Sequence, residues 1–236
     1  IMLAVSKGAP IMAFSPSSQP RINYVVVGAQ GLKSIKDLVG KRFGISGPAG
    51  FDNLLARIAL EQNNIDPEKV LWTQIGGSSA RAQALAAGRV DAVTVFLPNW
   101  IDLKGKGNFV KLVSLSQEFP TLTQSMLMAK VDWQKNNPEL AKAIIQGILQ
   151  AQKWAYNNKT AWVDKALTFI KGRERSVIEQ TYDDFKEMGM FAMDGGLSRS
   201  GSLKLMKLLI QSGDLAGEVP LEKWMNVGLL GSVLKD

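Results

Sequence analysis

Strand-like and helix-like segments alternate through the first half of this chain, and that alternation restricts its fold more than any other feature. Short apolar runs of strand length are separated by stretches whose apolar residues repeat at helical spacing. The predicted strands cover residues 11–14, 24–27, 41–46, 70–75, 90–96 and 109–115. Strands separated by single helices predict an α/β fold with a parallel-rich sheet, flanked by helices and connected by right-handed crossovers.

The predicted helices rest on apolar stripes at positions i, i+3, i+4 and i+7. One helix follows the glycine-containing turn and begins at Phe51, and another covers residues 78–87, with Gly88 in the position of a C-terminal cap. The second half of the chain is mostly helical, with helices expected to start at Asn137–Pro138 and to cover residues 160–170, 177–185 and 202–211. The first half therefore carries the predicted sheet.

Two residue types are absent from the 236 residues, and this excludes classes of chemistry. Without cysteine the chain has no disulfide, no thiol nucleophile and no thiolate metal site. Without histidine, Ser-His-Asp and Cys-His catalysis are excluded and zinc catalysis is disfavoured. We therefore expect no metal and no cofactor, in a chain long enough for one large domain or two small ones.

The net charge of +7 has three interpretations: nucleic-acid binding, an anionic ligand, or a generally basic surface. The 28 Lys and Arg residues are scattered, whereas nucleic-acid binders concentrate them in a patch interleaved with aromatic residues. The distribution favours a basic surface first and an anion-related role second, and we expect no nucleic-acid partner. No apolar run approaches the roughly 18 to 20 residues that cross a bilayer.

The first candidate site is a glycine-rich turn at residues 44–50, between a predicted strand and a predicted helix. Its G-x-x-G-x-x-G spacing is neither the dinucleotide fingerprint nor a P-loop. A helix N-terminus leaves backbone N–H groups without partners, so an anionic or polar group can dock there. The alternative is a tight strand-to-helix turn, and Asp52 is placed to occupy those donors itself.

A second candidate, residues 76–81, repeats the arrangement of strand, glycines, hydroxyls and helix. Ser78 or Ser79 either caps the helix or faces a ligand, with Arg81 as a bidentate partner for an anion. A third candidate is residues 96–100, where an aromatic, a proline and an amide follow a strand and either line a pocket or return to the core. Two glycine-and-serine corners at the carboxyl ends of neighbouring strands would face one crevice.

The order of these motifs resembles the nitrate/sulfonate/taurine-type substrate-binding proteins of ABC importers, a group that includes thiamine-precursor binders. Two runs carry most of the resemblance: residues 31–44, GLKSIKDLVGKRFG, and residues 86–92, AAGRVDA. The KGAP turn at residues 7–10 and the helix start at Asn137–Pro138–Glu139 occur in the matching order. The resemblance extends from Ser6 to about Asn158 and is looser beyond.

The resemblance implies a two-lobed, type II periplasmic-binding-protein-like fold. Lobe II would comprise residues 27–122, and lobe I would comprise residues 1–26 and the mostly helical residues 123–236. Two crossing strands near residues 24–26 and 124–126 would form the hinge. Family members begin with strand-helix-strand elements upstream of the KGAP turn, so the chain resembles a receptor that lacks the first part of its N-terminal lobe.

The function implied by the resemblance is that of a solute-binding component, not an enzyme. It would bind a small anionic or polar organic ligand (a sulfonate, nitrate, a carboxylate or a pyrimidine-like molecule) in the inter-lobe cleft by hinge closure. A membrane permease with a separate ATPase would be its partner, and we expect a monomer outside the cytoplasm, in the periplasm, with a lipid anchor left open. Two alternatives stay open: an enzyme of menaquinone-precursor type on the same scaffold, or the effector-sensing domain of a transcription regulator.

Carried over by position, the ligand-binding residues fall in three groups that coincide with the three candidate motifs. They are Ser46, Gly50, Phe51 and Asp52; Gly77, Ser78 and Ser79; and Leu97, Pro98 and Asn99. Arg81 is added to these candidates because of its charge and not because of the resemblance.

Overall fold

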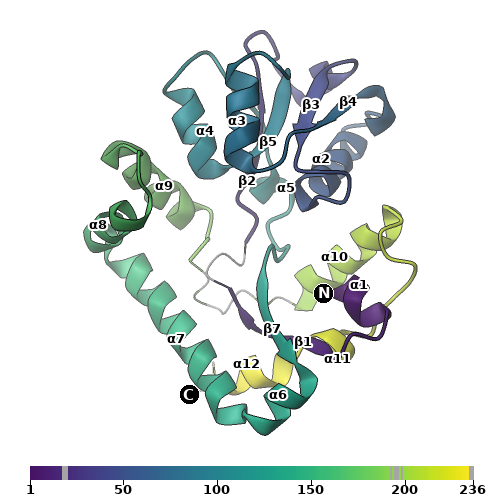
Figure 1. The fold of residues 1–236 in the computed structure, drawn as a ribbon, viewed down its shortest axis with the longest axis vertical. Coiled ribbons are helices and arrows are strands. Elements are labelled where there is room, and N and C mark those ends of the chain that lie inside the picture. The colour runs from purple at the N-terminus through teal and green to yellow at the C-terminus, as the bar shows by residue number, and fades with distance from the viewer. Residues whose placement is uncertain (18–20, 192, 194–196, 198, 234–236) are drawn as a thin grey trace. The chain divides into compact units, whose positions relative to one another are not determined.

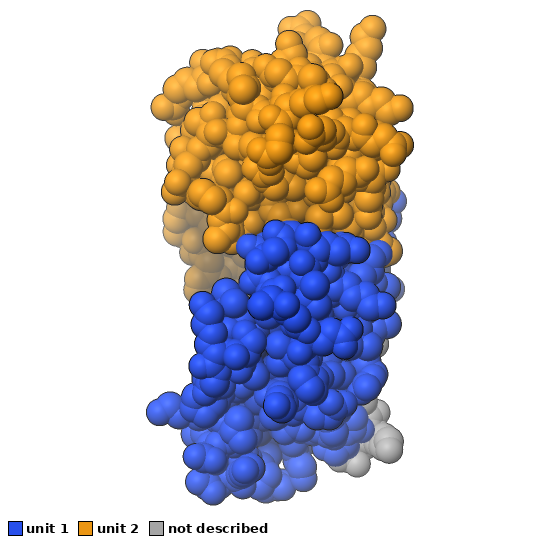
Figure 2. All heavy atoms as spheres, turned by 90° about the vertical axis from the view of Figure 1, so that its right-hand side faces the viewer, with its two compact units in different colours: residues 1–22, 121–164, 185–236 blue, residues 23–120, 165–184 orange. Residues whose placement is uncertain are grey.

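The computed structural model describes the chain except for residues 18–20, 192, 194–196, 198 and 234–236. Within the described residues the chain divides into two compact units. Unit 1 consists of residues 1–22, 121–164 and 185–236, and unit 2 of residues 23–120 and 165–184 (Figure 2). The chain passes between them next to both predicted hinge segments, at 22–23 and 120–121, and twice more in the helical half. The sequence predicts the whole of residues 123–236 in one lobe, whereas residues 165–184 belong to unit 2.

Unit 2 is built on a five-stranded sheet in the order β4-β3-β5-β2-β6 (Figure 1). Its strands are β2 (Tyr24–Gly28), β3 (Arg42–Ile45), β4 (Leu71–Gln74), β5 (Ala92–Phe96) and β6 (Val110–Ser114). Strand β3 runs parallel to β4 and β5, as predicted, but β2 is antiparallel to both β5 and β6. The segment after β2 contains only the 3-10 turn η1 (Ile35–Leu38), not the crossover helix on which a parallel assignment depends.

The helices of unit 2 form two groups on the sheet. The helices α3 (Ser78–Ala86) and α4 (Leu97–Lys104) pack together, whereas α2 (Phe51–Gln62) packs against the short helix α5 (Leu115–Glu118). Figure 1 shows α3 and α4 on one side of the strands and α2 on the other, as right-handed crossovers require. The turn η2 (Pro67–Lys69) precedes β4. The mixed sheet with helices on both sides confirms the predicted α/β class.

Unit 1 has a two-stranded antiparallel sheet, β1 (Ile11–Pro16) with β7 (Met126–Lys130), so parallel pairing is confined to unit 2 apart from an isolated bridge between Ala13 and Met225. Helices supply the rest of the described unit. They are α1 (Met2–Ser6), α6 (Val131–Asn136), α7 (Pro138–Asn157), α10 (Arg199–Gln211), α11 (Leu221–Trp224) and α12 (Val227–Val233). The helices α8 (Lys159–Phe169) and α9 (Arg175–Glu187) each contribute residues to both units.

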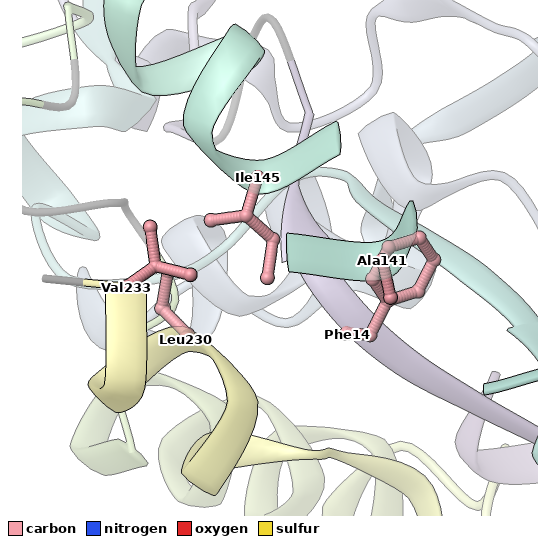
Figure 3. Close-up of a cluster of buried hydrophobic side chains, with 5 residues drawn as sticks. All are labelled: Phe14, Ala141, Ile145, Leu230 and Val233. Carbon is pink, nitrogen blue, oxygen red and sulfur yellow. The ribbon is translucent and has the colours of Figure 1, made fainter. Parts of the chain in front are cut away.

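A core cluster in unit 1 joins β1 to two helices that are distant in sequence. Phe14 of β1, Ala141 and Ile145 of α7, and Leu230 and Val233 of α12 are all buried and in contact (Figure 3). The predicted stripe of α7 therefore packs as expected from its period. No helix among the described residues is long and apolar enough to cross a bilayer.

Ile145→Ala should destabilise unit 1, because Ile145 is fully buried between β1 and α12 and its truncation leaves a cavity. We expect a loss of about 2–5 kcal/mol in urea unfolding, against less than about 0.5 kcal/mol for the control Gln146→Ala on the exposed side of α7. Equal effects of the two substitutions would show that the cluster is not packed as described.

A second prediction concerns Asp91, which joins the starts of β3 and β5. Its carboxylate accepts hydrogen bonds from the Arg42 guanidinium, at 2.8 and 3.1 Å, and from the Arg42 backbone N–H at 2.9 Å. The side-chain hydrogen bond from Arg42 lowers the pKa of Asp91 below its ordinary 3.8. A lowered folded-state pKa contributes stability that is complete above the unfolded value and is lost as the pH falls through the folded pKa.

Asp91→Asn should therefore reduce stability by up to about 1 kcal/mol at neutral pH, a modest effect because the pair is partly exposed. The difference from the unsubstituted protein should shrink as the pH is lowered below about 4. The measurement is urea unfolding at a series of pH values, with the exposed Glu61→Gln as the control. A difference that stays constant down to acid pH would contradict the assignment.

Candidate functional site

Three strand-to-helix corners lie at one edge of the unit 2 sheet. The neighbouring strands β4, β3 and β5 are parallel, so their carboxyl ends meet at the same edge. Each is followed by a helix that begins within six residues: β3 by α2, β4 by α3, and β5 by α4. Helix N-termini and strand ends thus converge where open α/β sheets bind ligands.

The first corner, residues 46–50, encloses a carboxylate of its own. The Asp52 carboxylate accepts a hydrogen bond from the Ser46 backbone N–H at 2.9 Å and a second one from the Ser46 hydroxyl. A side chain at Gly50 would collide with the Ser46 hydroxyl and the Asp52 carboxylate, so glycine is required there by close approach. Asp52 therefore occupies the hydrogen-bond donors of Ser46 itself. This is one of the two alternatives that the sequence leaves open for this turn.

The second and third corners are joined by hydrogen bonds between their hydroxyl and amide groups. The Ser78 hydroxyl donates to Asn99 Oδ1 at 2.8 Å and accepts from the Phe96 N–H at 2.9 Å. The Asn99 side-chain amide donates to the Ser79 hydroxyl at 3.3 Å. The start of α4 is thereby fixed against the start of α3, and the sequence-predicted residues of these two corners do lie together.

A buried charge pair connects the first corner to the second. Arg81 Nη1 lies 3.6 Å from Asp52 Oδ2, and both side chains are only 3% exposed. The Arg81 guanidinium also donates to two backbone carbonyls, Thr94 O at 2.6 Å and Gly76 O. Gly76 adopts a positive φ of 103°, which favours glycine and turns its carbonyl toward this cluster. Arg81 therefore links the Asp52 side chain to the backbone of Gly76 and of Thr94.

The predicted site residues separate into an accessible and a buried group. Those with exposed or half-buried positions at the corners are Ser46, Gly50, Phe51, Gly77, Ser78, Ser79 and Pro98. Those that are buried are Asp52, Arg81, Leu97 and Asn99. The buried group holds the corners in place, whereas the accessible group presents hydroxyl and backbone groups to solvent.

The start of α3 is the most open of the three corners. Gly77 is the N-cap residue and forms no side-chain cap, and the first turn of α3 has no acidic residue. Both Gly77 and Ser79 are exposed. By contrast, the first turn of α2 already contains Asp52, and α4 has Pro98 in its first turn. The first turn of α4 likewise contains no acidic residue, but its Asn99 is buried. The N–H groups at the start of α3, at the positive end of the helix dipole, are therefore the more exposed donors for an anionic or polar group.

Sequence reasoning did not find the aromatic pair beside these corners. Tyr24 of β2 stacks on Phe96 of β5, with ring centroids 4.6 Å apart and an angle of 13° between the planes. The two residues are register partners only because β2 is antiparallel to β5. Phe96 is part of the third candidate motif. Tyr24 could not be predicted as its partner, because the sequence predicts a parallel β2 and the pairing depends on an antiparallel one.

The charges of Asp52 and Arg81 influence the pKa of Tyr24 in this aromatic pair. Burial raises the pKa of the Tyr24 hydroxyl above its ordinary value, and the Asp52 carboxylate raises it further, while Arg81 opposes both effects. Burial lowers the pKa of the Arg81 guanidinium, and the Asp52 charge opposes that. Among the described residues no group of three or more Asp and Glu side chains could hold a metal ion.

The model of the family described as NMT1/THI5 like matches residues 1–161 of the chain. A protein of Brucella abortus, named as a binding protein, is 29% identical over 149 residues. That match covers 62% of this chain and 46% of the relative, so the chain corresponds to less than half of that protein's length.

Two solved structures share the fold across the whole chain. The ligand-binding component of an ABC-type import system from Staphylococcus aureus superposes with a TM-score of 0.78 at 16% identity, covering 100% of this chain and 78% of the other. A structure from Methylobacillus flagellatus, described as the periplasmic sulfonate-binding protein SsuA, gives a TM-score of 0.77 at 22% identity, covering 100% and 72%. At these identities the likeness establishes the fold alone.

Replacing either member of the buried pair should destabilise unit 2, because the remaining charge stays buried without compensation. We expect Asp52→Asn and Arg81→Met each to cost about 3 kcal/mol, and the double variant to cost at least about 1 kcal/mol less than the sum. Urea unfolding measures all three, with the exposed Arg89→Met as the control. Strictly additive losses would mean that the two side chains do not interact.

Proposed function

This chain belongs to the NMT1/THI5-like family, and from that premise we propose that it is a solute-binding component of an ABC importer. The family membership and the shared fold of import-system binding components support this proposal. It binds a small anionic or polar organic ligand at the three corners of unit 2 and releases the ligand unchanged.

The observation that carries the proposal is the open start of α3. Its N-terminal N–H groups have no side-chain cap, its own first turn contains no acidic residue, and the Ser79 hydroxyl lies in that turn. Charge-assisted hydrogen bonds from such donors suit a sulfonate, nitrate or carboxylate oxygen. The likeness to a sulfonate-binding protein is consistent with this class.

The eleven residues predicted for the site take two different roles in this proposal. Direct contacts come from the accessible group defined above, with Ser79 and Gly77 binding the negative group of the ligand. Asp52, Arg81, Leu97 and Asn99 are positioning residues, because they are buried and, Leu97 apart, hydrogen-bonded to the corners. Arg81 thus acts through the backbone of Gly76 and not as the bidentate ligand partner expected from its charge.

The proposed partners and location follow from the same assignment. A membrane permease recognises the loaded form, and a separate subunit hydrolyses ATP. The protein works as a monomer outside the cytoplasmic membrane. In receptors of this class a ligand shifts the open–closed equilibrium only by its differential affinity for the closed state.

A thermal-shift panel of ethanesulfonate, nitrate, acetate and 4-aminopyrimidine tests the proposal. We expect at least one of these to raise the unfolding temperature, because a ligand at 100 times its Kd adds about 2.7 kcal/mol of stability. Mass spectrometry of the recovered ligand should show no conversion. Turnover, or no stabilisation by any of the four compounds, would contradict a receptor of this class.

A matched pair of variants locates the site. Ser79→Asp places a carboxylate at the start of α3, which favours the helix but repels an anion, so binding should fall at least about tenfold without loss of stability. The neutral Ser79→Asn should bind within about threefold of the unsubstituted protein. Equal binding by the aspartate and asparagine variants would place the ligand elsewhere.

A further inference from the structure

A cavity in unit 2 lies along the sides of α3 and α4 and reaches the strand-to-helix corners only at Ser79 and Asn99. Its volume is about 630 Å³, within the range of small-molecule pockets. The α3 residues in the lining lie at i, i+3, i+4 and i+7, starting from Ser79. Helix α4 contributes Asn99, Asp102 and Leu103, and Lys106 follows the end of that helix. Residues 170–173 between α8 and α9 form the remaining wall. All of these residues belong to unit 2.

Three of the four α3 residues that line the cavity have small side chains, and Gln83 is the fourth. Ala82 and Ala86, one helical turn apart, face the cavity where larger residues would close it. Leu103 of α4 and Ile170 supply further apolar surface. This part of the lining, made of Ala82, Ala86, Leu103 and Ile170, therefore suits the aliphatic or otherwise apolar part of a ligand.

Charged side chains in the lining are mostly basic. Lys106, Lys171 and Arg173 line the cavity together with a single carboxylate, that of Asp102. Arg173 Nη2 lies 2.9 Å from Asp102 Oδ2, with both side chains about one-fifth exposed, so this pair ties residues 170–173 to α4. Gly172, with φ of 76°, makes the turn that brings Lys171 and Arg173 to the same wall.

The remaining two cations are not neutralised. No ion pair is found for Lys106 or Lys171 in the part of the chain that the structure describes. We propose that this cavity is a second ligand site, which binds an amphipathic organic anion with its apolar body on Ala82, Ala86, Leu103 and Ile170 and its acidic group at Lys106 and Lys171. The site touches the α3 corner only through Ser79 and Asn99 and does not depend on the importer function.

Calorimetric titration of the 236-residue chain at low salt with three probes tests the apolar contact and the charge contact separately. Hexanoate carries both the charge and the body, acetate only the charge, and hexanamide only the body. We expect hexanoate to bind at least about tenfold more tightly than either of the others, because each methylene that is buried adds to the affinity and the charge adds independently.

Variants place the binding in this cavity. The double variant Lys106→Gln/Lys171→Gln should weaken hexanoate at least about fivefold and leave hexanamide unchanged, and Ala86→Leu, which fills the hollow at an exposed helical position, should weaken it about tenfold. Lys104→Gln, on α4 outside the lining, is the control and should change the Kd less than about twofold. Hexanoate binding no tighter than hexanamide, or an equal effect of the control, would overturn the proposal.

Discussion

The buried pair of Asp52 and Arg81 is the interaction on which the arrangement of unit 2 depends. Asp52 holds the turn after β3 through the donors of Ser46, and Arg81 holds the backbone at the ends of β4 and β5 through two carbonyls. The two buried charges lie 3.6 Å apart and so connect the turn after β3 to the ends of β4 and β5. Burying them costs desolvation free energy, which their mutual attraction and their hydrogen bonds must offset. Such a pair specifies one arrangement of the corners, because any other leaves a charge unpaired.

This internal carboxylate also decides what the site can bind. The Asp52 carboxylate already occupies the Ser46 donors of the first corner, which leaves few donors there for a second anion. For this reason the proposed anion site lies at the start of α3. The helices α3 and α4 begin at the second and third corners, and residues along their sides line the basic cavity. The two helices therefore contribute residues to both proposed sites, the polar corner and the amphipathic cavity.

Local patterns were enough to predict the strand–helix alternation of unit 2, the long helix α7 and the three corners, because each has a short-range signal such as a glycine turn or an apolar stripe. The direction of β2 has no such signal, since it depends on which strands become neighbours, and with it the Tyr24–Phe96 stack was missed. Arg81 shows the same limit: its charge suggested a ligand contact, but burial directs it to Asp52 and to backbone carbonyls. The assignment of residues 165–184 to unit 2 likewise rests on long-range contacts such as that of Arg173 with Asp102.

The central claim is that an anion binds at the uncapped start of α3. An amide NMR titration of the ¹⁵N-labelled chain with ethanesulfonate tests it most directly, because it reports on each backbone N–H separately. We expect the largest chemical-shift changes at the amides of Gly77, Ser78 and Ser79, with smaller changes at residues 46–51. Saturable binding that leaves those three amides unchanged, or no binding at all, would contradict it.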